Sequence, residues 1–217
     1  MHDTREGATH LVSGSRFHKG AKPSQGGQFS DHILCERHEN VTASLDKYGT
    51  EFVRMAERRF RALDAKTSFQ IENARPTELL KFALSVIWRE VASSGRSEKN
   101  LSLGPYWKPV IDAVFGSGEL SWPTMIQRTR FFAGDALDIK LGIHPHTIRF
   151  EKLNAWTFTV AGFAFFIVSD RRGLPRLPQY LSANEGNPLT IIVADKRPIS
   201  EVGILQPILS NMRLRGK

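Results

Sequence analysis

Four of the seven histidines and the only cysteine lie between residues 10 and 38, near the N-terminus. Cys35 and His38 form a Cys-x-x-His pair in the densest part of this stretch. A thiolate and an imidazole separated in this way across a tight turn can bind one tetrahedral zinc ion. Because one pair supplies half of such a site, further ligands would come from carboxylates or from other histidines: His2, His10 and His32. The alternative is a half-buried cysteine beside surface histidines.

A second group of candidate residues consists of arginines at helical spacing: Arg54, Arg58 and Arg61. They lie within residues 41–63, where apolar residues recur at spacings of three and four and therefore predict an amphipathic helix. The arginines form a separate stripe, which is usually a solvated helix face but can bind phosphate in a basic chain. Arg171 and Arg172 follow a long apolar run, and their guanidinium groups could also hold phosphate. A solvated loop is the alternative at that position.

Two further helices are expected to position these groups. Residues 78–91 are apolar on most sides, which predicts a central and largely buried helix, with Thr77 as its N-cap after Pro76. A shorter helix is expected over residues 106–115, because two glycines follow it closely. Residues 1–30 are rich in Gly, Ser and His, and this composition indicates a loop.

Beyond residue 119 the apolar pattern becomes one of strands. β-Branched and aromatic residues between turn formers predict strands over residues 147–150, 156–168 and 190–194. His144-Pro145-His146 is expected to form a turn before the first of them, and a short helix is expected after Pro198. The predicted fold class is therefore α+β, with a helical middle followed by a mostly antiparallel C-terminal sheet.

The bulk composition indicates a globular protein with a basic surface. Of the 217 residues, 41% are hydrophobic and 24% are charged, and both values are near the averages of globular domains. The formal net charge is +8 and the pI is about 9.9. A basic chain attracts phosphate through counterion release and electrostatic steering, so nucleic acid is the expected partner. A soluble basic protein without a polyanionic partner is the alternative.

The single cysteine and the apolar runs suggest a cellular location. One cysteine forms no intrachain disulfide, which is typical of a reducing compartment. The first ten residues lack the apolar segment of a secretory signal. The longest apolar run, residues 156–168, is too short to cross a bilayer as a helix. We therefore expect a cytoplasmic protein that does not enter a membrane.

Five segments occur in an order shared with a known family. They are Ala-Thr-His-Leu-Val at 8–12, Ile-Leu-Cys-Glu-Arg-His-Glu at 33–39, Leu-Asp-Lys-Tyr at 45–48, Leu-Lys-Phe-Ala-Leu-Ser-Val-Ile-Trp-Arg at 80–89 and Leu-Gly-Pro-Tyr at 103–106. In this order they resemble a group of bacterial and phage HNH-like endonucleases. The likeness extends over about half the chain, and the C-terminal half adds little to it.

The resemblance implies a domain organisation and a chemistry. Residues 1–62 would form an N-terminal ββα-metal HNH-like module that ends in the long helix, and residues 63–217 would form the helical and antiparallel-sheet body. In such enzymes a histidine deprotonates water for attack on a phosphodiester. A divalent ion such as Mg²⁺ or Mn²⁺ stabilises the charge that develops on the phosphate.

The resemblance also implies a role for individual residues near the N-terminus. His10 would be the general base, Asp31 would orient it, and Glu39 would bind the metal at the start of the helix. A structural zinc site would remain only in part, as Cys35, His38 and His2.

The chain departs from the family pattern at three places. The first Cys-x-x-Cys ahead of His10 is absent, His38 replaces a cysteine, and Ser13 replaces a proline. Two functions therefore stay open: an active nuclease on DNA or RNA, in antiphage defence or as a toxin, and an inactive relative that binds nucleic acid or protein as a regulator or inhibitor. A structural protein that binds a partner through the apolar sheet is the third. Metal binding separates the first from the others, and salt-sensitive DNA binding separates the second from the third.

Overall fold

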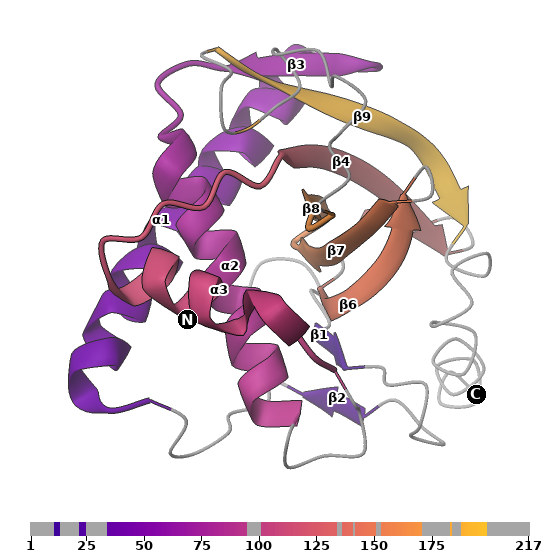
Figure 1. The fold of residues 1–217 in the computed structure, drawn as a ribbon. Coiled ribbons are helices and arrows are strands. Elements are labelled where there is room, and N and C mark those ends of the chain that lie inside the picture. The colour runs from indigo at the N-terminus through magenta and orange to yellow at the C-terminus, as the bar shows by residue number, and fades with distance from the viewer. Residues whose placement is uncertain are drawn as a thin grey trace.

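A computed structural model of the chain describes residues 11–13, 22–24, 34–94, 101–133, 136–140, 142–150, 153–170, 183 and 188–198. This part of the chain forms three α-helices, one 3-10 turn and nine strands, which Figure 1 shows in order of colour. The helices are α1 (Glu36–Leu63), α2 (Pro76–Ser94) and α3 (Trp107–Phe115), and the turn η1 is Gly104–Tyr106. The strands are β1 (Leu11–Ser13), β2 (Lys22–Ser24), β3 (Ser68–Ile71), β4 (Thr124–Ala133), β5 (Ala136–Ile139), β6 (Ile143–Phe150), β7 (Leu153–Val160), β8 (Phe163–Val168) and β9 (Leu189–Pro198).

Helix α1 confirms the amphipathic pattern and extends it by five residues toward the N-terminus. Its apolar face is buried at Leu45, Phe52 and Phe60, among others. The helix ends where Asp64 adopts a left-handed conformation, with φ 43° and ψ 45°. At Gly49 an added Cβ would lie 2.6 Å from the Phe82 ring, so the glycine allows α1 and α2 to approach closely.

Helix α2 is the central helix that its apolar sequence predicts. Leu79, Leu84 and Ile87 are fully buried in it. The prediction of Thr77 as N-cap is wrong, because the helix already begins at Pro76. Proline has a fixed φ that suits the first helical position, where its missing N–H is not needed. Helix α3 confirms the third predicted helix, and η1 precedes it.

The larger sheet has seven strands among the described residues, six of them in the order β3-β9-β4-β8-β7-β6, with β5 paired to β4. The pairs are antiparallel except for β4 and β9, which run parallel. The prediction of a mostly antiparallel sheet is therefore confirmed. Figure 1 shows the sheet curving from β3 and β9 at the top to β6 below.

The apolar run that was expected to form one strand over residues 156–168 is a hairpin instead. Strands β7 and β8 meet at a two-residue turn, where Ala161 has φ 48° and Gly162 has φ 86°. Two positive φ values give the turn type whose twist matches that of the flanking strands. This turn was not predicted from the sequence because the apolar pattern runs through it without a break. Alanine also rarely adopts the positive φ of Ala161, which is usual for Gly or Asn.

Several strands of the structure lie in segments that the sequence did not predict to be strands. Strand β3 lies between α1 and α2 in the chain, and β4 comes before the first predicted strand. The segment expected as a loop contains β1 and β2, which pair antiparallel with each other. β1 lies beside β6, as Figure 1 shows. The helix expected after Pro198 lies outside the described residues.

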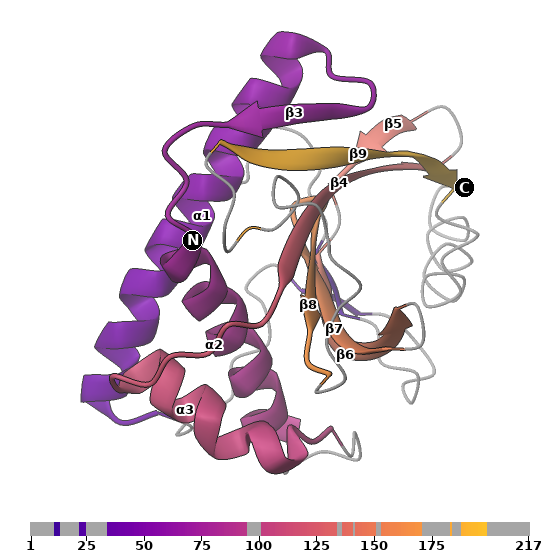
Figure 2. The ribbon, with the colours of Figure 1, turned by 45° about the horizontal axis from the view of Figure 1, so that its top comes forward.

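The three helices lie on one side of the sheet, which is clearest in Figure 2. One apolar core joins the two layers and includes residues from α1 through β9. In this core Phe158 stacks on Phe165, with ring centres 4.8 Å apart, and the edge of Phe82 meets both. The predicted α+β class is confirmed, while the ββα-metal module and the boundary at residue 62 stay predictions. No described helix is long and apolar enough to cross a membrane.

Candidate metal and nucleic-acid site

Cys35 and His38 lie together at the N-terminal end of α1. Cys35 is the N-cap residue, with an extended backbone, and its side chain does not cap the helix. Its Sγ atom lies 3.1 Å from Nδ1 of His38. The first helical turn holds this spacing, because the N–H of Glu39 donates to the carbonyl of Cys35 at 2.9 Å. Cys35 is exposed and His38 is half-buried, so both donors are near solvent.

The donors of this pair suit zinc. Sulfur and imidazole nitrogen are its preferred ligands, and in a tetrahedral site they lie roughly 3.5 Å apart. The observed 3.1 Å would therefore widen by only about 0.4 Å on binding an ion. Within the described ranges no group of three His, Cys, Asp or Glu residues is placed to hold a metal. The pair has the chemistry and spacing for two ligands of such a site.

An aromatic contact fixes the ring of His38. The edge of this imidazole meets Phe115 at the end of α3, with ring centres 4.6 Å apart. Phe115 in turn packs edge-on against Trp88 of α2 at 5.1 Å. The histidine is therefore oriented by all three helices together, which reduces the side-chain entropy lost when its nitrogen binds a partner.

Several residues of the expected site fall outside the part of the chain that the structure describes: His2, His10, Asp31, Arg171 and Arg172. Strand β1 begins at Leu11, so His10 directly precedes a described strand. Of the candidate catalytic and metal residues, the structure brings together the side chains of Cys35 and His38. Glu39 is linked to Cys35 through its backbone N–H.

The arginine stripe lies on the exposed side of the C-terminal half of α1. Arg54 and Arg58 are exposed, and among the described residues neither guanidinium makes a hydrogen bond or an ion pair. Arg61 differs, because its Nε donates to Oε1 of Glu57 at 2.8 Å while 64% of its side chain stays exposed. The stripe thus has two guanidinium groups facing water and one held by a carboxylate.

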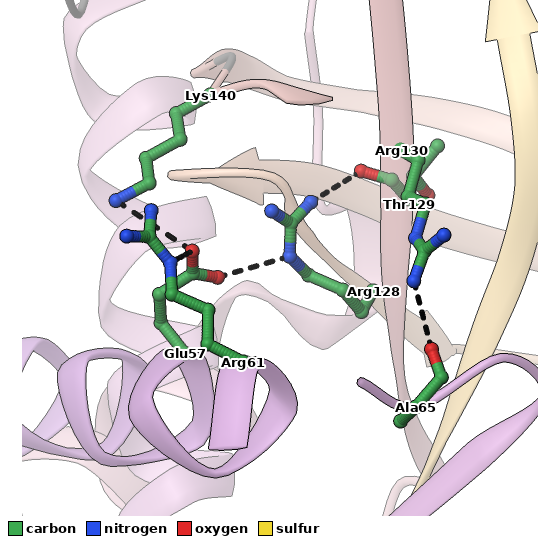
Figure 3. A network of polar contacts seen from close by, with 7 residues as sticks. All are labelled: Glu57, Arg61, Ala65, Arg128, Thr129, Arg130 and Lys140. Carbon is green, nitrogen blue, oxygen red and sulfur yellow. Dashed lines mark hydrogen bonds and ion pairs between the residues drawn. The ribbon is translucent and has the colours of Figure 1, made fainter. Parts of the chain in front are cut away.

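Glu57 is the centre of a charged cluster that sequence reasoning missed (Figure 3). Its Oε2 accepts from Nε of the fully buried Arg128 at 3.1 Å, and its Oε1 lies 3.7 Å from Nζ of Lys140. Arg128 also donates to the carbonyl of Thr129 at 2.6 Å. The only local signal was the spacing of Glu57 and Arg61, because Arg128 is 71 positions away in the chain.

The cluster keeps Glu57 ionised in a mostly buried position. Burial raises the pKa of this carboxyl, but the charge of Arg128 and the contacts of Arg61 and Lys140 outweigh burial. They hold the pKa below its ordinary value. The Arg128 guanidinium lies 4.9 Å from the centre of the Phe60 ring and 5.3 Å from that of Phe163, so aromatic faces enclose it.

His144 and His146 lie within β6 rather than in the predicted turn. A bulge interrupts the β6–β7 register here, because three steps from Ile143 to His146 match two steps from Thr159 to Thr157. Nδ1 of His144 lies 3.1 Å from Glu90 of α2, on the helix side of the sheet.

The bulge turns His146 to the opposite face of the sheet from His144. His146 pairs with Thr157, which lies between two residues of the helix-facing core, Trp156 and Phe158. Cross-strand partners share a face, so His146 faces away from the helices. The two histidines therefore do not converge on one ion.

Comparison with known protein families, with curated proteins and with solved structures finds no match to this chain.

Proposed function

We propose that this protein is a metal-dependent nuclease of the HNH-like kind, which hydrolyses phosphodiester bonds of DNA or RNA. The observation that carries the proposal is the contact between Cys35 Sγ and His38 Nδ1 at the start of α1. A sulfur and an imidazole nitrogen at this distance are preorganised to share an ion. The order of elements also suits the proposal, since the β1–β2 hairpin precedes this helix in the chain.

In this proposal the residues near the N-terminus divide the work. His10 accepts a proton from the attacking water as general base, and Asp31 orients the histidine. Glu39 binds the catalytic divalent ion, Mg²⁺ or Mn²⁺, which supplies charge stabilisation when bound. Cys35 and His38, with His2, hold a zinc ion that ties the N-terminal segment to α1.

A second function is a nucleic-acid- or protein-binding regulator that has lost catalysis. The specific observation in its favour is that His38 stands where the HNH-like pattern has a cysteine, and that no Cys-x-x-Cys precedes His10. Both candidates place the protein in the cytoplasm, with a role in antiphage defence or as a toxin for the first and as an inhibitor or regulator for the second.

The test of cleavage incubates the purified full chain with plasmid DNA and with total RNA, in Mg²⁺, in Mn²⁺ and in EDTA. We expect metal-dependent cleavage that His10→Ala reduces at least about 100-fold, the usual contribution of a general base. Cleavage in EDTA, or cleavage that His10→Ala leaves unchanged, would contradict the proposed mechanism. Absence of cleavage with both metals would leave the binding function.

A separate measurement tests the zinc ligands. We expect the purified protein to contain about one equivalent of zinc by mass spectrometry, and Cys35→Ser and His38→Gln each to lose most of it, because each removes one of few ligands. His146→Gln is the matched control, since this histidine faces away from the helices. Equal zinc content in all four proteins would remove Cys35 and His38 from the site.

A further inference from the structure

The C-terminal half of α1 and the segment after β5 place basic side chains on one surface. We propose that Arg54, Arg58, Arg61 and Lys140, named here the basic ridge, bind the phosphate backbone of double-stranded nucleic acid. The choice of nucleic acid as partner rests on the proposed function. The assignment of Lys140 to the surface and the choice of a duplex go beyond it.

Glu57 joins the two halves of the ridge. Its Oε1 accepts from Arg61 at 2.8 Å and lies 3.7 Å from Lys140, so one carboxylate oxygen positions cations from two distant parts of the chain (Figure 3). Both cations still reach solvent, since 64% of the Arg61 side chain and 32% of the Lys140 side chain are exposed. A guanidinium held at Nε keeps its outer N–H groups for a phosphate oxygen.

The ridge, counted together with the buried Arg128 and the carboxylates of Glu57 and Glu51, has an excess of positive charge. Glu57 carries one negative charge against the three positive charges of Arg61, Arg128 and Lys140, which leaves two. Arg54 and Arg58 add two more and the exposed Glu51 subtracts one, so the excess is three. From Arg54 to Arg61 the ridge extends about 10 Å along the helix, at 1.5 Å per residue.

A basic C-terminal half of a helix has a simpler explanation, because cations there offset the helix dipole. That explanation applies to Arg61, the basic residue of the last turn, but not to Lys140, which follows β5. A phosphate-binding face requires basic side chains to converge on one surface, whatever element they come from. Compensation of a helix dipole does not require a lysine from outside the helix.

The side chains that accompany the ridge favour a duplex over a single strand. Proteins that bind single strands stack the bases on exposed aromatic rings. Among the described residues the exposed large hydrophobic side chains are Leu63 and Trp107, and Trp107 is on α3. The described side chains of the ridge therefore offer charge without a stacking surface, which suits a backbone whose bases are already paired.

The test measures binding of a fluorescent 20-base-pair duplex by anisotropy over a range of salt concentrations, with the full chain and in EDTA so that no cleavage occurs. We expect the slope of log affinity against log salt to fall by about 0.9 for each phosphate contact that is removed. Arg58→Gln and Lys140→Gln should each lose about this amount. Lys108→Gln, which removes an exposed lysine of α3, is the matched control and should leave the slope unchanged.

Three outcomes would overturn the inference: a slope unaltered in both ridge variants, a slope lowered as much by Lys108→Gln, or tighter binding of a single strand of the same sequence. Arg58→Gln guards against a folding artefact, because Arg58 makes no ion pair among the described residues. Cleavage is scored separately with Mg²⁺ or Mn²⁺. Duplex binding through the ridge without cleavage would support the inference and contradict the proposed nuclease activity. Cleavage by ridge variants whose salt slopes equal that of the wild type would contradict the inference and support the nuclease activity.

Discussion

Two carboxylates of α1 connect it to other elements, and their surroundings differ. Asp46 accepts two hydrogen bonds from the guanidinium of Arg89 on α2, each at 2.6 Å, while the two side chains are 39% and 30% exposed. Glu57 makes a longer contact of 3.1 Å to Arg128, but the two side chains are 11% and 0% exposed. The shorter, bidentate contact of Asp46 thus occurs where water screens the pair, and the longer contact of Glu57 occurs where water is excluded.

From this comparison we expect burial, rather than contact length, to decide how much each pair contributes to stability. Breaking a buried ion pair leaves an uncompensated charge in a medium of low polarity, whereas an exposed charge regains its hydration. Removing a partner from the Glu57 cluster should therefore cost much more than removing one from the Asp46 pair.

The largest effect is expected for Arg128→Met. We expect this variant to lose about 3–5 kcal/mol of unfolding free energy in urea, because Glu57 then keeps its buried position with only the more exposed Arg61 and Lys140. Replacing both partners, in Glu57→Met with Arg128→Met, should recover part of the loss, since a buried pair can be exchanged for apolar side chains. A loss below about 1 kcal/mol in the single variant would show that the pair contributes as little as an exposed one.

A smaller loss of unfolding free energy is expected for Gly162→Ala, because the added methyl group would contact Arg128 of the same cluster. Gly162 has φ 86°, and an added Cβ would lie 2.5 Å from Nη1 of Arg128. We expect a loss of about 1–3 kcal/mol, measured by urea unfolding, from strain and from displacement of the guanidinium. Gly104→Ala is the control, because this glycine has φ 53° but nothing within 4 Å of an added Cβ. Equal losses in the two variants would assign the whole effect to backbone strain.

For the exposed pair, Asp46→Asn should cost about 0.5–1.5 kcal/mol in the same measurement. The bidentate geometry places the pair near the upper end of exposed ion pairs, but Arg89 can return to water. High salt should reduce the difference from the wild type, and it should leave the effect of Arg128→Met nearly unchanged. A loss as large as that of Arg128→Met would contradict the role given to burial.

The smallest effect is the dependence of stability on pH through Glu57. Its pKa in the folded protein lies below the ordinary value of 4.5, so the charged form stabilises the fold above that pH. This contribution should be lost as the pH falls below 4.5 and through the folded pKa, because protonation removes the partner of Arg128. Urea unfolding between pH 3 and pH 7 should show a smaller acid-induced loss in Glu57→Gln than in the wild type. Parallel curves would exclude Glu57 as a source of acid sensitivity.

Local patterns predicted the elements that are long and have one apolar face. The spacing of Leu45 and Phe52 was enough for α1, because 28 residues repeat the helical period many times. Strand β3 has only the four residues 68–71, too few for a period to stand out. Its place in the sheet depends on pairing with β9, far along the chain, and no local pattern carries that information.

The candidate site divides in the same way. Cys35 and His38 are three positions apart, so the sequence could single them out together. Lys140 and Glu57 meet only after β4 and β5 have packed against α1, and Arg128 appeared as an ordinary charged residue. Contacts between distant charges follow from the fold and cannot be read before it.

The place of β9 in the sheet sets an order for assembly during synthesis. β9 lies between β3 and β4, and Phe69 of β3 pairs with Ile191, which is 122 positions further along the chain. Among the described strands β9 is the partner of β3, so at a translation rate of about 5–20 residues per second β3 waits roughly 6–24 s for it after leaving the ribosome. The helices and the β6–β8 meander can pack during that interval, whereas the edge formed by β3 closes only when β9 is inserted between two strands that are already in place.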